Sequence, residues 1–182
     1  QFVLLLKNNQ NLLPLAKSQK NIAVIGALAA DKNSPLGNWR MGSDDNSATS
    51  VTEGLAAAGI SFNYAKGADV ITNEASFPVE LQINTTDTTG FANAVALAKK
   101  SEVVVMVLGE HGMQSGEGRS RSNLDLPGVQ QQLLEAVYQV NKNIVLVVMS
   151  GRPLVLTWAN THIPAILEAW QLGTTTGTAL TQ

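Results

Sequence analysis

The sequence predicts an α/β protein with a mostly parallel sheet and helices on both faces, a three-layer α/β sandwich of the flavodoxin-like kind. Two continuous apolar, β-branched runs, 102–109 and 143–151, are typical of strands buried on both faces. Segments of helical period stand between the strand-like runs, joined by short links. Alternation of this kind requires crossover connections, which place parallel strands side by side and helices on both faces.

The first strand and the first helix have recognisable ends. Residues 21–26 form an apolar run that suits a buried strand. In the segment 50–59, Ser50 is a good N-cap residue and Glu53 stands three residues later, as in a capping box. Gly59 then supplies a helix stop signal, so the segment is predicted to be a helix.

The remaining elements follow the same alternation, with one exception. Residues 60–67 alternate as a strand does, and 90–100 is typical of an Ala-rich helix with a cationic end that suits the helix dipole. The segment 164–170 predicts a third buried strand. A helix is predicted over 128–141, with one face formed by Val129, Leu133, Ala136, Val137 and Val140. The N-terminal segment 2–15 is the exception, and we interpret it as an extended segment that packs against something outside this chain.

The composition limits the class of protein. The chain has 182 residues, 45% hydrophobic and 14% charged, so we expect one folded domain over residues 1–182. A net charge of −2 gives no basis for binding nucleic acid or an anionic membrane, and no apolar stretch approaches the roughly 20 residues of a membrane span. Without cysteine, neither disulfides nor thiolate metal sites can form. Because the chain opens on Gln1 rather than Met, we interpret it as a fragment of a longer chain.

Motifs for cofactors and metals are missing from the sequence. It has neither G-x-G-x-x-G nor G-x-x-x-x-G-K-[ST], so a flavodoxin-like nucleotide binder is a weak alternative that depends on the fold alone. His111 and His162 lie far apart without ligand-like spacing, and Asp44 and Asp45 have no neighbours at calcium-loop positions. We therefore expect no cofactor and no metal.

The loops after the strands are the expected place for function. In an open α/β sheet, ligands bind beyond the carboxyl ends of the strands. The segments at that edge are 26–47, 109–127, 150–154 and 170–177. The first two are much longer than the usual 2–6 residues, and long loops on a rigid sheet are usually functional or disordered.

The loop 109–127 carries the side chains best suited to chemistry. Glu110 stands at the strand tip, and Glu117 lies between two glycines, followed by Arg119 and Arg121. Glu117, Arg119 or Arg121 alone would be typical of a solvated loop charge, but a carboxyl group between glycines and followed by two guanidinium groups resembles the side chains of an acid/base site. The "MSGRP" segment lacks the first Gly of a G-x-S-x-G nucleophile motif, and an alternative for Arg152 is that it holds a neighbouring loop.

Several motifs, taken in order along the chain, resemble the second, α/β-sandwich domain of glycoside hydrolase family 3, the β-glucosidase family. The resemblance covers nearly the whole chain. The segments that carry it are "VLLLKNNQNLLPL", "NIAVIG", "PLGNWRMGSDD", "VVVMVLGEHGMQSGEGRSRSNLDLP", "SGRPL" and "AILEAWQLGTTTG". One departure is that family members commonly have G-x-E-x-G where this chain has Gly-Thr-Thr-Thr-Gly at 173–177.

The resemblance implies an enzyme that hydrolyses terminal β-linked sugars with retention of configuration. It places the nucleophilic Asp on a preceding (β/α)₈ barrel that is absent from this chain, and Glu117 matches the acid/base position. The isolated fragment would then be inactive. The resemblance also implies a periplasmic or secreted location. The alternative from another class is a non-catalytic α/β module that binds carbohydrate or a partner.

Other residues are expected to support Glu117. Arg119 and Arg121 would anchor the loop by pairing with Asp125 or with carboxylates of the barrel. Trp39 is a candidate aromatic wall for the leaving group, or else a loop-packing residue. The remaining candidates for substrate binding or loop anchoring are Glu110, His111 and Arg152.

Overall fold

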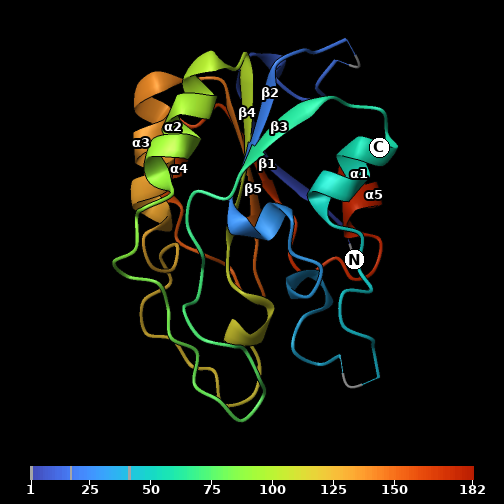
Figure 1. Ribbon diagram of the computed structural model, residues 1–182, viewed down its shortest axis with the longest axis vertical. Helices are drawn as coiled ribbons and strands as arrows, with labels where there is room; N and C mark the ends of the chain where they lie inside the picture. Colours follow the sequence, from blue (N-terminus) through green and yellow to red (C-terminus); the bar gives the residue numbers. More distant parts are fainter. Residues whose placement is uncertain (1, 17, 41) are drawn as a thin grey trace.

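The computed structural model describes residues 2–16, 18–40 and 42–182 and confirms the predicted α/β architecture. A six-stranded sheet of order β1-β6-β5-β4-β2-β3 forms the central layer (Figure 1). Its strands are β1 (Leu4–Asn8), β2 (Ile22–Ile25), β3 (Phe62–Ala65), β4 (Val103–Gly109), β5 (Ile144–Met149) and β6 (Ala165–Glu168). Every pairing is parallel except that of β1 with β6.

The five parallel strands have the flavodoxin-like order. Numbered among themselves along the chain, they lie second, first, third, fourth, fifth, from β3 at one edge to β6. The order reverses between β2 and β4, which are hydrogen-bonded neighbours. At such a reversal the connections leave toward opposite faces of the sheet, so that a crevice opens beyond the strand ends. The two long loops follow these two strands.

Helices form the two outer layers (Figure 1). One face of the sheet is covered by α2 (Phe91–Lys100), α3 (Gln130–Val140) and α4 (Thr157–His162). The other face is covered by α1 (Val51–Ala57) and α5 (Thr176–Thr181). Short 3₁₀ turns in the connections are η1 (Asn9–Asn11), η2 (Ala27–Ala29), η3 (Ser34–Leu36) and η4 (Gly112–Gln114). No helix in the described ranges is long and apolar enough to cross a membrane.

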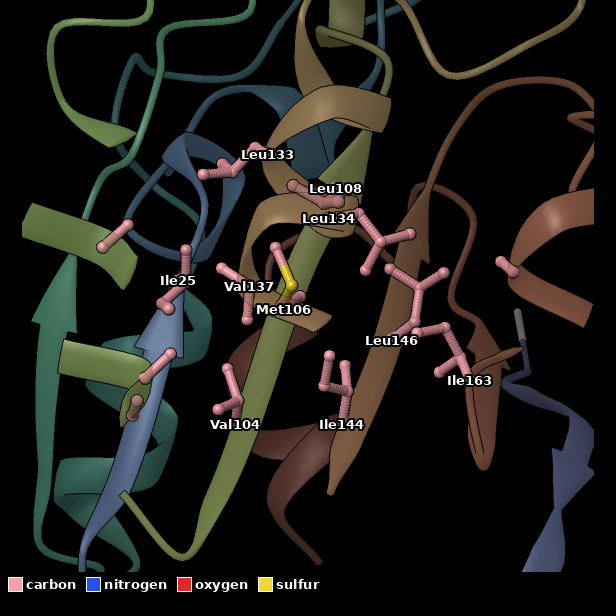
Figure 2. Close-up of a cluster of buried hydrophobic side chains, with 14 of the residues drawn as sticks. Ile25, Val104, Met106, Leu108, Leu133, Leu134, Val137, Ile144, Leu146 and Ile163 are labelled. Atoms are coloured by element: carbon pink, nitrogen blue, oxygen red, sulfur yellow. The ribbon is translucent and has the colours of Figure 1, made fainter. Parts of the chain in front are cut away.

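The core explains why the central strands are apolar throughout. Every residue of β4 and β5 is buried, because helices cover both faces of the sheet. Figure 2 shows Met106 and Leu146 of these strands facing Leu134 and Val137 of α3. These four side chains are fully buried. The framework that carries the loops is therefore rigid and close-packed.

The predicted signals at the ends of α1 are confirmed. The Ser50 side chain accepts a hydrogen bond from the Glu53 backbone N–H, and the Glu53 carboxylate accepts one from the Ser50 backbone N–H. Gly59 follows the helix with a φ of +73°, which favours glycine.

The buried face of α3 differs in part from the predicted one. Val129, Leu133 and Val137 are buried as predicted, but Val140, in the last turn of the helix, is 37% exposed. Leu134, which the predicted stripe omitted, is fully buried instead. The contact face of a globular helix is wider than a single line of residues, so it takes in Leu134 beside Leu133.

The prediction for the N-terminal segment was wrong about its partner. The segment is extended, but β1 pairs with β6 of the same chain, with Leu4 opposite Glu168 and Asn8 opposite Ala165. An antiparallel edge strand needs no crossover helix, so the alternation of strands and helices could not reveal it. The short helices α4 and α5 were not predicted either, because six residues are too few for a periodic signal.

Candidate active site

The two long loops meet where the strand order reverses. The Ser34 hydroxyl of loop 26–47 accepts a 2.9 Å hydrogen bond from the Gly112 backbone N–H of loop 109–127. The loop after β6 joins them, because the Gln171 amide donates to the Gly112 carbonyl and the Ser115 hydroxyl, both at 3.3 Å. Met41, within the tryptophan-containing motif, lies outside the described residues.

Glu110 forms the buried base of the 109–127 loop. It directly follows β4, and its side chain has no exposed area. Arg121 donates a 2.8 Å hydrogen bond to Glu110 Oε1, and the Gly151 backbone N–H donates to Oε2 at 3.2 Å. Arg152 Nε lies 3.0 Å from the same Oε1 as an ion pair, without the direction of a hydrogen bond. A buried carboxylate is thus matched by two guanidinium groups.

The two arginines also bind the backbone of the loop on both sides of Glu117. Arg152 Nη2 donates to the carbonyls of Gln114 and Arg119, the latter at 2.8 Å, so Arg152 holds the neighbouring loop as its alternative interpretation predicts. Arg121 Nη2 donates to the backbone carbonyl of Asp125 at 2.9 Å. The expected pairing of Arg121 with the Asp125 carboxylate was wrong, because the buried Glu110 takes the ion pair and Asp125 offers only its backbone.

Within this chain, Arg119 pairs with backbone carbonyl groups and not with the Asp125 carboxylate. Its Nη2 donates to three backbone carbonyls, those of Ser76, Phe77 and Val79, at 3.3, 2.8 and 2.9 Å. A guanidinium group presents several donors in a fixed plane and can therefore hold a turn by its carbonyl groups. Arg119 fastens the loop to the 76–79 turn.

Glu117 occupies an exposed turn between two glycines. Gly116 and Gly118 have φ values of +104° and +69°. A Cβ added to Gly116 would lie 1.8 Å from the Asn38 side-chain amide, whereas one on Gly118 would meet nothing within 4 Å. The Glu117 side chain is exposed. The carboxyl group therefore projects from a turn whose near side is packed on loop 26–47.

Trp39 and His111 stand apart from the Glu110 ion pairs. Trp39 follows the Asn38 that packs on Gly116, and it is 65% exposed. The His111 Nδ1 accepts a hydrogen bond from the Met113 backbone N–H at 3.2 Å, and burial lowers the pKa of His111. His111 lines a separate cavity of about 300 Å³ together with Asp31 and Tyr64.

A second buried carboxyl group, Glu168, was missed in the sequence. It ends β6, is 4% exposed, and accepts hydrogen bonds from the Ser150 hydroxyl at 3.2 Å and the Trp170 backbone N–H at 3.1 Å. Burial raises its pKa to about 7, and the charge of Glu110 acts in the same direction. The available signal was a Glu inside the apolar run 164–170, directly at the functional edge of the sheet.

The loop 173–177, where the resembling family commonly has Glu, packs against the start of α1. The Thr49 backbone N–H donates to the Thr174 carbonyl, and the Gly177 N–H donates to the Thr49 carbonyl, both at 2.8 Å. Thr175, at the usual Glu position, is exposed. The absent carboxylate therefore leaves no gap in the packing of this loop.

The chemical capacity of the site is that of one exposed carboxyl group on an anchored loop. Within residues 2–16, 18–40 and 42–182, no three His, Asp or Glu side chains cluster in a way that could hold a metal ion. Glu117 can give or accept a proton at a ligand held above the sheet edge. Glu110 and Glu168 are buried beneath the loop, so neither offers a second exposed carboxyl group there.

Comparison with known proteins gives the family. The model of the glycosyl hydrolase family 3 C-terminal domain matches residues 3–182. A β-xylosidase of Formosa agariphila and a periplasmic β-glucosidase of Salmonella typhimurium are each 36% identical over 98% of this chain and 24% of their own length. A crystal structure of a family 3 β-glucosidase from Bifidobacterium adolescentis superposes with a TM-score of 0.80 and 35% identity, over 98% of this chain and 24% of that one. This chain spans about a quarter of the length of these relatives, and it belongs to the glycosyl hydrolase family 3 C-terminal domain family.

Proposed function

We propose that this chain is the second domain of a retaining, exo-acting β-glycosidase, in which Glu117 is the general acid and base. The substrate would be a terminal β-linked sugar, as the names of the β-glucosidase and β-xylosidase relatives suggest. A (β/α)₈ barrel elsewhere in the full-length chain would supply the nucleophilic Asp and most of the sugar-binding groups. Because one relative is named as periplasmic, we extend the same location, or secretion, to this protein.

The observation that carries the proposal is the contrast between the anchored loop and its exposed carboxyl group. In a retaining glycosidase the two carboxyl groups stand about 5–5.5 Å apart across the bond that breaks. A carboxyl group from one domain can reach that position only on a loop that projects and yet is fixed. Arg121 and Arg152 fix the legs of the loop, while the glycine turn presents Glu117.

In the proposed reaction, Glu117 acts twice. It first donates its proton to the leaving oxygen while the Asp of the barrel attacks the anomeric carbon. It then takes a proton from the water that hydrolyses the glycosyl-enzyme. The acid role requires a raised pKa, which burial against the barrel and the nearby nucleophile would provide. Trp39, exposed beside the Glu117 turn, would offer an aromatic surface to the leaving group.

The test is Glu117→Gln in the full-length protein. For glycosides with poor leaving groups, kcat/KM should fall by roughly 10²–10⁴-fold, because these need protonation. Activated aryl glycosides should lose much less. Azide should partly restore turnover of activated substrates by Glu117→Ala, since it replaces the water that needs a base. Equal losses on both substrate classes would exclude the acid role.

Glu110→Ala is the matched control for azide rescue. It also removes a carboxyl group from the same loop, but one that is buried and bound to two arginines. We expect its activity to fall through displacement of the loop and to stay low with azide. If azide restored Glu110→Ala rather than Glu117→Ala, the assignment of the acid/base residue would be wrong. If the full-length wild-type protein were inactive on a panel of aryl glycosides, the binding-module alternative would be favoured.

A further inference from the structure

A second concave site lies beside the C-terminal part of the 109–127 loop, from residue 120 onward. It is a cleft of about 820 Å³, within the range typical of small-molecule sites. Its walls come from residues 120–123 and 125–128, from Gln131 and Glu135 on α3, and from Trp158 on α4. Glu117 is not among its lining residues, so the cleft is distinct from the proposed acid/base position.

The cleft presents hydrogen-bonding groups that the fold leaves for a ligand. Among the described residues, Asp125 is hydrogen-bonded only through its backbone N–H and carbonyl, so its carboxylate stays available. Glu135 accepts one hydrogen bond, at 2.7 Å from the Gln131 amide, through Oε1. Its Oε2 and the Gln131 carbonyl oxygen are therefore further acceptors on the same wall.

Trp158 gives the cleft a fixed aromatic wall. Its ring stacks on His162 with centroids 4.2 Å apart and an interplanar angle of 14°. Tyr138 meets it edge-on at 5.4 Å and 85°. An indole held from two sides loses little rotamer freedom when a ligand binds, which favours affinity.

The charges of the cleft define the class of ligand. Arg121 is the one cation among the lining residues, and it is ion-paired with Glu110, which Arg152 also contacts. Asp125 and Glu135 add negative charge without a cationic partner in the described part of the chain, so phosphates and other anions would be repelled. Carboxylate and amide acceptors suit a ligand rich in neutral O–H donors, and an aromatic ring suits its C–H faces.

We propose that this cleft is a second saccharide-binding site, which takes a neutral oligosaccharide apart from the reacting bond. Carboxylates of Asp125 and Glu135 accept hydrogen bonds from sugar hydroxyls, and Trp158 supports a ring face. Arg121 lines the cleft and also anchors Glu110, so a bound sugar would touch the C-terminal part of the loop that carries Glu117.

The experiment is titration calorimetry of the full-length protein with a sulfur-linked β-disaccharide, which is not hydrolysed. We expect two binding sites per chain. Glu135→Ala should weaken one of them about tenfold, the effect of losing a hydrogen bond to a charged group. Trp158→Ala should weaken the same site, and Trp158→Phe, which keeps an aromatic ring and guards against misfolding, should weaken it less.

The control variant is Glu102→Ala. Glu102 is also an exposed carboxylate, but it precedes β4 at the opposite end of the sheet. It should leave both sites unchanged. Binding that neither Glu135→Ala nor Trp158→Ala weakens, or a full-length structure in which the protein itself fills the cleft, would overturn the proposal. A single site that both variants weaken would instead support the cleft and count against saccharide binding at the proposed catalytic site. Because the ligand is not cleaved, none of these outcomes depends on the role of Glu117.

Discussion

At the base of the 109–127 loop, Glu110 is buried and bound by two arginines, whereas seven residues later Glu117 is exposed between two glycines. The same residue type thus serves opposite purposes within one loop. The buried glutamate is ion-paired with two arginines and fixes the path of the chain. The exposed glutamate has few constraints and stays available for a ligand. The comparison teaches that a buried, ion-paired carboxylate can fix the loop that presents an exposed one.

The largest expected effect comes from breaking the ion pairs that Glu110 makes with Arg121 and Arg152. Glu110→Gln keeps the shape of the side chain but leaves the guanidinium groups of Arg121 and Arg152 without their counter-charge. Breaking a buried ion pair costs about 3–5 kcal/mol, and we expect the lower end because both arginines are about one-fifth exposed. Denaturant unfolding of the 182-residue chain measures this. If the free energy of unfolding fell by less than about 1 kcal/mol, the ion pairs of Glu110 would not be what fixes the loop.

The second prediction concerns the other carboxyl group of the base, Glu168, which has no arginine. Its pKa in the folded protein is raised from 4.5 to about 7 by burial, so the folded state binds more protons than the unfolded state between these values. The free energy of unfolding therefore falls as pH rises from 4.5 to 7. Glu168→Gln cannot ionise and should abolish this loss, of about 2 kcal/mol.

Unfolding of wild type and Glu168→Gln at pH 5 and pH 8 provides the measurement. The variant should gain stability relative to wild type at pH 8 and show little difference at pH 5. A gain of equal size at both pH values would mean that ionisation of Glu168 is not involved. The pair Glu110 and Glu168 would then differ in packing rather than in charge.

The framework was predictable because its signals are local. Continuous apolar runs gave β4 and β5, and the Ser50–Glu53 spacing gave the start of α1. The edge strand β1 was missed as part of the sheet because antiparallel pairing with β6 joins residues about 160 positions apart, as in Leu4 with Glu168. No periodicity in the segment 2–15 could report such a partner.

The candidate site was predictable in its location but not in its contacts. The length and glycine content of 109–127 marked the loop, and parallel topology placed it at the carboxyl edge. Which arginine meets which carboxylate depends on burial that emerges only after folding. The ion-pair partner of Arg121 is therefore Glu110 and not the predicted Asp125. Glu168 was not predicted because it lies inside an apolar run.

The third prediction tests which side of Glu117 is packed against the rest of the protein. In Gly116→Ala, the new Cβ would collide with the Asn38 side chain, which is itself only 9% exposed, at a φ that disfavours alanine. In Gly118→Ala only the φ is unfavourable. We expect a loss of about 2 kcal/mol for the first and about 1 kcal/mol for the second. In the full-length protein, kcat/KM for a glycoside with a poor leaving group should fall further in Gly116→Ala than in Gly118→Ala. The reverse ranking would place the packed part of the turn on the other side of Glu117.

The smallest effect is expected at another exposed position of the same edge, Thr175, where the resembling family commonly has Glu. Thr175 faces solvent just before α5, so Thr175→Glu adds a charge without displacing a packed group. Surface substitutions of this kind change stability by less than about 0.5 kcal/mol, and the same limit on transition-state binding corresponds to roughly a twofold change in kcat/KM. Steady-state kinetics of the full-length variant, with Thr174→Glu as the neighbouring exposed control, measure it. A much larger gain for Thr175→Glu than for Thr174→Glu would mean that position 175 reaches the bound sugar, where an added carboxylate improves binding in the transition state.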